Sequence, residues 1–134
     1  MPHSGSCLCG TVRFEIEAPF DHFLYCHCSR CRKATGTAHA ANVVVAPERF
    51  RWTAGEDQVA RYDLPTARSF ATAFCKHCGA PMPHLTRSRT RVIVPAGSLD
   101  DAPEGKPTVH AYWGSRAVWF EDDPDLPKQD EAAF

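Results

Sequence analysis

The sequence predicts a single, mainly β domain, and three observations lead to this prediction. The chain has 134 residues, a length that suits one hydrophobic core better than two independent ones. Apolar residues recur in short runs of strand length, and no long segment shows the helical period of about 3.6 residues. Eleven prolines and eight glycines separate these runs, as expected for many short strands joined by turns.

The first predicted strand covers residues 11–18, TVRFEIEA, where apolar and polar residues alternate strictly. One face of this strand is therefore expected to lie on the core. Residues 23–26, FLYC, are predicted to form a second strand that leads into a cysteine-rich stretch. Residues 42–46, NVVVA, are predicted to form a short buried strand, which ends at Pro47.

Four further strands are expected at similar spacing in residues 58–64, 68–74, 91–97 and 109–113. The second of them leads directly to a cysteine. The C-terminal sequence EDDPDLPKQDEAAF is polar, acidic and proline-containing, which is typical of a loosely held segment. We therefore predict that the domain covers residues 1–126 and that a polar tail covers residues 127–134.

The charge of the chain does not favour a polyanionic partner. Fifteen basic and sixteen acidic residues give a formal net charge of −1, which indicates neither nucleic-acid binding nor electrostatic membrane binding. The N-terminal sequence MPHSGSCLCG lacks the features of a signal peptide, and no apolar stretch approaches membrane-spanning length. We therefore expect a cytoplasmic protein without a nucleic-acid or membrane partner, and the sequence indicates no oligomeric state.

Seven cysteines are many for this length, and they form three groups: Cys7 and Cys9; Cys26, Cys28 and Cys31; and Cys75 and Cys78. Cysteines so close in sequence are poorly placed for disulfides with one another, but they can share a metal ion. In a reducing compartment, clustered cysteines also bind metal more often than they form disulfides. The pattern therefore favours metal sites.

The segment CKHCG predicts a zinc knuckle, in which Gly79 can adopt the positive φ that such a turn needs. A knuckle supplies only two of the four ligands of a tetrahedral zinc ion. If the triplet stays together, the N-terminal CLC pair is the only other pair. We therefore predict a structural site whose removal unfolds the domain, formed by Cys7, Cys9, Cys75 and Cys78.

The remaining three cysteines, those of CHCSRC, would hold a second zinc ion with three protein ligands. Such an ion keeps a position for water or substrate, which distinguishes catalytic from structural zinc. The alternatives are free, buried thiols or a fourth ligand among His27, His39, His84 and His110. His27 is the least favoured, because a residue between two ligands on an extended segment points to the opposite side.

Basic residues follow the triplet at Arg30, Arg32 and Lys33. Positive side chains lower the pKa of nearby thiols and can bind an anionic substrate, although a solvated basic turn is the simpler alternative. We predict that Arg32 and Lys33 bind the anionic groups of a substrate. His110 is a candidate proton shuttle, but a lone histidine on a strand is more often packed or exposed.

Five blocks, GSCLCGTVRFEI, YCHCSRCRKATG, FCKHCG, PAGSLDD and HAYWGSRAVW, resemble in order those of the glutathione-dependent formaldehyde-activating family, which includes relatives of centromere protein V. The resemblance runs from residue 6 to about residue 126. It implies a zinc-binding β-tent, similar to Mss4-like folds. It also implies a structural zinc on Cys7, Cys9, Cys75 and Cys78 and a catalytic zinc on Cys26, Cys28 and Cys31.

The activity implied by the resemblance is the condensation of glutathione with formaldehyde to S-(hydroxymethyl)glutathione, which is classed as a carbon–sulfur lyase reaction. We therefore expect a zinc enzyme with two ions per chain that joins a small, glutathione-like thiol to formaldehyde or a related aldehyde. Thiolate is the nucleophile required, and a free thiol of pKa near 8.5 is mostly protonated at neutral pH. The alternatives are a non-catalytic, zinc-stabilised binding module and an enzyme of this fold that acts on another small molecule.

Overall fold

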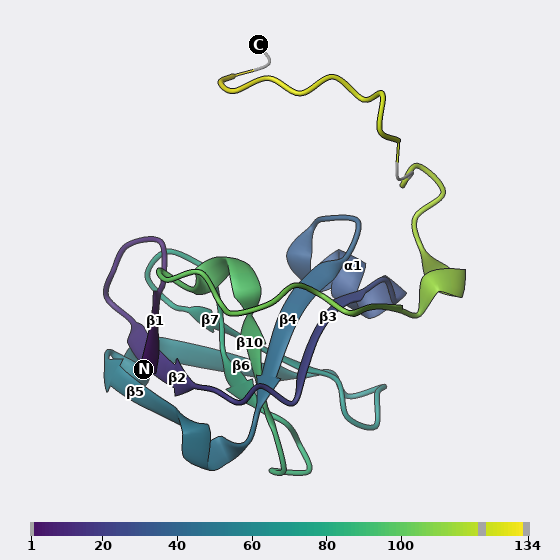
Figure 1. Cartoon of the computed structure of the whole chain (residues 1–134). Coiled ribbons are helices and arrows are strands. Elements are labelled where there is room, and N and C mark those ends of the chain that lie inside the picture. The colour runs from purple at the N-terminus through teal and green to yellow at the C-terminus, as the bar shows by residue number, and fades with distance from the viewer. Residues whose placement is uncertain (1, 121–122, 133–134) are drawn as a thin grey trace.

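Three small β-sheets and one short helix form the part of the chain that the structure describes, residues 2–120 and 123–132 (Figure 1). The structure is a computed structural model. All three sheets contribute side chains to one buried core, which confirms the predicted mainly β single domain. The described elements also include the 3-10 helices η1 (Pro47–Arg49), η2 (Glu56–Gln58), η3 (Ala96–Ser98) and η4 (Trp113–Ser115).

The first sheet has the antiparallel order β1 (Pro2–Ser6), β2 (Arg13–Glu17) and β5 (Phe50–Ala54). Phe14 and Ile16 of β2 are fully buried, as the alternation in residues 11–18 predicted. The sequence analysis did not predict β1 or β5. A Cβ atom on Gly5 of β1 would collide with the Phe14 ring, so glycine allows these two strands to pair closely.

The second sheet has the order β11 (Val109–Ala111), β3 (His22–Cys26), β4 (Ala40–Val45), β10 (Val92–Pro95) and β9 (His84–Leu85). Strand β11 runs parallel to β3, and the other neighbours are antiparallel. Val43 and Val45 are fully buried, as expected for the NVVVA run. The strand predicted at residues 109–113 is shorter, because Tyr112 adopts a left-handed conformation with a φ of 55°.

The third sheet has the antiparallel order β6 (Val59–Asp63), β7 (Ala71–Cys75) and β8 (Pro81–Met82). Ala73 of β7 and Met82 of β8 are neighbours across this sheet, and both belong to the core. Strand β7 ends at Cys75, as the sequence predicted. The chain then turns through residues 76–80 and returns as β8, which places Cys78 in the connection.

Helix α1 (Ser29–Thr35) was not predicted from the sequence. It has seven residues, none of them buried, so it carries no apolar stripe that periodicity could reveal. Cys28 is the N-cap, and its sulfur accepts a hydrogen bond from the backbone N–H of Cys31. Gly36 ends the helix in the left-handed conformation, with a φ of 71°.

In the segment after η4, Ala117 is buried and the Phe120 ring lies 5.1 Å from the His27 ring, whereas residues 123–132 run away from the sheets (Figure 1). Val118, Trp119 and Leu126 in this segment are largely exposed. Residues 127–132 of the predicted tail are exposed and form no helix or strand, whereas residues 133 and 134 lie outside the described residues. The domain boundary at residue 126 therefore stays a prediction. In the described part of the chain, no helix is long and apolar enough to cross a bilayer.

Candidate metal centres and the adjoining pocket

The seven cysteine sulfurs gather into one group of four and one group of three, and within each group they lie within 4.8 Å of one another. The group of four, which we call the four-sulfur group, consists of Cys7, Cys9, Cys75 and Cys78. The group of three, which we call the three-sulfur group, consists of Cys26, Cys28 and Cys31. The spacing of the cysteines in the sequence predicted the same two groups.

The distances in the four-sulfur group fit a shared metal ion and not a disulfide. The sulfurs of Cys7 and Cys9 are 3.6 Å apart, and those of Cys9 and Cys75 are 4.0 Å apart. A tetrahedral zinc ion with Zn–S bonds of about 2.3 Å requires S···S separations of about 3.8 Å. A disulfide bond has a length of about 2.05 Å. All seven cysteines are accordingly free thiols in the structure.

Backbone N–H groups stabilise the negative charge of the four-sulfur group. The N–H of Val12 donates to the Cys7 sulfur, and the N–H of His77 donates to the Cys75 sulfur, both at 3.3 Å. The N–H of Ala80 is the main cause that lowers the pKa of Cys78 to about 6. The local backbone is thus arranged around thiolates, which are the form that binds metal.

The three-sulfur group is built by the end of β3 and the first turn of α1. Cys26 is the last residue of β3, and the helical turn brings Cys31 back to Cys28, whose sulfur accepts its N–H at 3.3 Å. The hydrogen bond from the Cys31 thiol is the main cause that lowers the pKa of Cys26 to about 6, and the same contact raises the pKa of Cys31. The group therefore releases a first proton readily, as metal binding requires.

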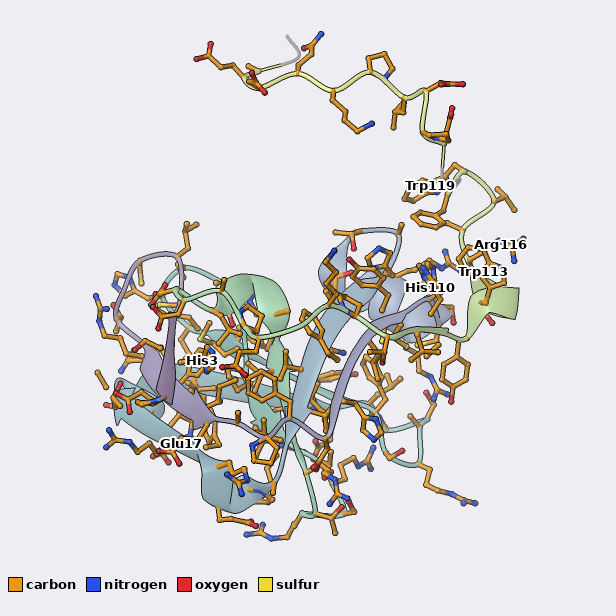
Figure 2. The ribbon with its side chains drawn as sticks, viewed as in Figure 1. His3, Glu17, His110, Trp113, Arg116 and Trp119 are labelled. Carbon is orange, nitrogen blue, oxygen red and sulfur yellow. The ribbon has the colours of Figure 1, made fainter. Side chains whose placement is uncertain are left out.

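In the described part of the chain, no histidine or carboxylate joins the three sulfurs within the same distance. His27 is fully buried, and its Nε2 lies 2.8 Å from Nδ1 of His110. Burial is the main cause that lowers the pKa of His27, and the neighbouring charges of His39, His110 and Arg116 lower it further. Figure 2 shows His110 near Trp113 and Arg116, and the Arg116 guanidinium lies 4.4 Å from the centre of the Trp113 ring.

A pocket of about 270 Å³ adjoins the three-sulfur group, because Cys31 also lines the pocket. The lining comes from α1, from β4 and β10, which are neighbours in the second sheet, and from the segments around β7 and β8 in the third sheet. His84 of β9 also faces the pocket. Burial lowers the pKa of His84 to about 4, with the charge of Arg61 as a second cause, so this imidazole is neutral at pH 7.

A family model described as "Glutathione-dependent formaldehyde-activating enzyme" matches residues 2–115. The chain belongs to this family. The matched range contains both cysteine groups and all residues that line the pocket. The family recognised from the sequence motifs is thereby confirmed.

One relative carries the name of this family, and one solved structure shares the fold. A Halomonas elongata protein named "Putative glutathione-dependent formaldehyde-activating enzyme" is 28% identical over 127 residues, which cover 87% of this chain and 78% of that protein. The crystal structure of a Rhodobacter sphaeroides protein is similar with a TM-score of 0.62 at 25% identity, and the match covers 78% of this chain and 97% of that chain. The mainly β fold is therefore shared with an experimentally determined structure.

The predicted substrate-binding residues Arg32 and Lys33 lie on α1 but do not line the pocket. Successive residues of a helix are about 100° apart, so Cys31, Ala34 and Thr35 face the pocket together while Arg32 and Lys33 point elsewhere. Lys33 is exposed, whereas Arg32 is half-buried. The Nε atom of Arg32 is buried and has no hydrogen-bond partner among the residues that the structure describes.

Sequence reasoning missed most of the pocket. Its wall includes Phe70, Ala73 and Met82, which are ordinary apolar residues in or beside strands. His84 was considered only as a fourth metal ligand. No local pattern marks these residues, because they adjoin Cys31 only after strands distant in sequence have come together.

Proposed function

We propose that this chain is a zinc-dependent enzyme of the carbon–sulfur lyase type, which joins a small thiol such as glutathione to formaldehyde or a related aldehyde. The observation that carries the proposal is the difference between the two cysteine groups. Four sulfurs complete one metal site, whereas the other group has only three sulfurs and adjoins a pocket. Family membership and the name of the Halomonas relative support the choice of thiol and aldehyde.

Both groups fit zinc by the chemistry of their donors. Sets of thiolates select zinc over magnesium or calcium, which prefer oxygen ligands. In this proposal each chain binds two zinc ions, a structural ion in the four-sulfur group and a catalytic ion in the three-sulfur group. When bound by three protein ligands, zinc supplies an open position and lowers the pKa of a thiol or water there.

In the proposed addition, a bond forms between the thiol sulfur and the carbonyl carbon, and the C=O π pair moves to oxygen. The oxygen takes up the proton that the thiol has lost, so no oxidant or reductant is needed. Arg32 and Lys33 would hold the carboxylates of the thiol outside the pocket, and the buried, unpartnered Nε of Arg32 supports this role. His110 is the candidate proton shuttle. Its Nδ1 contacts Nε2 of His27, which stands between Cys26 and Cys28 in the sequence.

The proposal can be tested by counting zinc and by following thiol binding. We expect two zinc ions per chain by mass spectrometry of the metal content. In a cobalt-substituted sample, glutathione is expected to change the thiolate-to-cobalt charge-transfer band, and ¹³C-formaldehyde with glutathione should give S-(hydroxymethyl)glutathione by NMR faster than without protein. A single metal per chain would contradict the division into two sites. Two metals without a response to any thiol would favour the non-catalytic binding module.

A further inference from the structure

The pocket beside Cys31 has properties that indicate which aldehyde the site accepts. We infer that it binds the hydrocarbon substituent of an uncharged aldehyde larger than formaldehyde; this inference rests on the proposed thiol–aldehyde function. The three-sulfur group and the pocket share Cys31, so a carbonyl group at the open side of the sulfurs has space for its substituent directly beside it.

The lining of the pocket carries no fixed charge. Among the described residues that line it, none is Arg, Lys, Asp or Glu, and His84 is held neutral by burial. A carboxylate or ammonium group placed there would lose its hydration without gaining a partner, which is strongly unfavourable. The charged ends of a thiol such as glutathione therefore belong outside this pocket, which leaves it to the other reactant.

The apolar surface of the pocket fits a hydrocarbon chain. Phe70, Ala73, Met82 and Ile93 contribute carbon atoms from the strand side, and Ala34 contributes them from α1. Small apolar pockets with a few polar groups are typical sites for small molecules. Each methylene group buried in such surroundings strengthens binding by about fourfold.

The size of the pocket exceeds what formaldehyde needs. Its volume is about 270 Å³, whereas one water molecule occupies about 30 Å³ in the liquid. Formaldehyde has two heavy atoms and would leave most of this space to water. A substituent of several carbon atoms would displace that water and contact Met82 and Phe70.

The reaction with such an aldehyde is the same addition. The thiol sulfur bonds to the carbonyl carbon, the π pair moves to oxygen, and the oxygen takes up one proton, which gives a hemithioacetal. The substituent takes no part in the bond changes. It contributes binding energy remote from the reacting atoms, and its length therefore determines specificity.

A binding experiment tests the pocket without catalysis. The zinc-loaded protein is labelled with ¹³C-methyl methionine, and the Met82 signal is assigned by its loss in Met82→Leu. Formamide, propanamide and hexanamide serve as uncharged, unreactive probes of increasing length, and 6-aminohexanamide serves as a probe with a charge at the far end of its chain. We expect a saturable shift of the Met82 signal with hexanamide, weaker binding by about fourfold for each methylene removed, and no saturable shift with formamide or 6-aminohexanamide.

Two filling variants and a matched control sharpen this experiment. Ala34→Leu and Ala41→Leu place a larger side chain in the pocket from α1 and from β4, and each is expected to weaken hexanamide binding by about tenfold. Ala54→Leu makes the same change at an exposed position of β5 outside the pocket, and it is expected to leave binding unchanged. Equal binding of formamide and hexanamide, or preferential binding of 6-aminohexanamide, would overturn the inference.

The catalytic test uses glutathione with formaldehyde, propanal and hexanal. We expect kcat/KM to increase with chain length, and Ala34→Leu to lower the ratio of kcat/KM for hexanal to kcat/KM for formaldehyde by about tenfold. Activity with formaldehyde but not with longer aldehydes would overturn the inference and leave the proposed function in place. Binding of hexanamide without catalysed addition to any aldehyde would overturn the proposed function and the aldehyde assignment together.

Discussion

The two cysteine groups differ in how far apart in the sequence their sulfurs lie and in how they are attached to the hydrophobic core. The four-sulfur group joins the N-terminal loop to the turn after β7, and Cys7 and Cys75 are buried against the core. The three-sulfur group comes from one continuous stretch, and Cys28 and Cys31 are only half-buried. A metal ion in the first group closes a long loop of the chain, whereas an ion in the second group closes a short one.

In the proposed function, this difference is the reason for ascribing stability to one group and reactivity to the other. Helix α1, which carries Cys31, has no buried residues, so the core does not depend on it. The four-sulfur group includes Cys7 and Cys75, which are themselves part of the core cluster. Closure of distant segments and contact with the core are therefore the features on which the proposed structural role of the four-sulfur group rests.

The largest expected effect is that of Cys78→Ser, which removes one ligand of the four-sulfur group. Structural zinc contributes an apparent free energy of about 10–16 kcal/mol, which equals or exceeds the net stability of about 5–15 kcal/mol of a typical domain. The variant is therefore expected to lose one zinc ion and to be unfolded at 25 °C. Zinc content and far-ultraviolet circular dichroism measure both consequences.

Cys28→Ser is the matched variant in the three-sulfur group. Serine is a good N-cap residue, so α1 keeps its cap after the replacement. We expect this variant to lose catalytic activity while its stability changes by about 1 kcal/mol or less. If the two variants unfolded to the same extent, the distinction between the two groups would be wrong.

Stepwise removal of metal tests the same comparison in the unmodified chain. A chelator of graded strength is expected to remove the ion of the three-sulfur group first, because this group has fewer ligands and two of its three cysteines flank or lie on a helix without buried residues. Activity should therefore disappear at a lower chelator concentration than the circular dichroism signal. Loss of both at one concentration would mean that the two groups hold metal equally strongly.

A smaller effect is expected for Arg32→Ala. If its guanidinium holds a carboxylate of glutathione, the variant should raise the KM for glutathione by about tenfold, which corresponds to about 1.4 kcal/mol. Cysteamine has no carboxylate, so its KM should not change. Lys106→Ala removes an exposed positive charge elsewhere and serves as the control. Equal changes for both thiols would contradict a role in carboxylate binding.

The sequence predicted those strands whose buried face produces a visible alternation of apolar and polar residues. The alternation in residues 11–18 marks β2 because one face of that strand lies on the core. Strand β1 was missed because its sequence, PHSGS, has no apolar alternation. Its pairing depends on the space that Gly5 leaves for the ring of Phe14, which is a tertiary contact.

The site could be predicted in part for the same reason. Cysteine spacing is a local signal, and it grouped the sulfurs as the structure gathers them. The pocket has no such signal, since Cys31, Ala73 and His84 come together through the assembly of two sheets and a helix. Residues that become functional only through their neighbours in space carry no local pattern, so they cannot be identified from a single sequence.

The smallest expected effect concerns His84, which lines the pocket beside the three-sulfur group. Burial lowers its pKa from 6.5 to about 4, and Arg61 and Asp63 are the charged groups that act on it. The unfolded chain therefore binds a proton near pH 6.5 that the folded chain resists until about pH 4. The contribution of neutral His84 to stability is complete above pH 6.5 and is lost progressively as the pH falls toward 4.

The measurement compares the free energy of unfolding at pH 7.5 and pH 5.0 for the original chain and for His84→Gln. Because both proteins contain the same cysteine groups, proton competition for the metal cancels in the difference between them. The free energy of unfolding should fall less between pH 7.5 and pH 5.0 in His84→Gln than in the original chain. After allowance for the partial exposure of His84, the difference should be about 1–2 kcal/mol. His22→Gln replaces an exposed histidine of β3 and should behave like the original chain. An equal loss in all three proteins would mean that His84 titrates normally and that the pocket is more hydrated than its lining suggests.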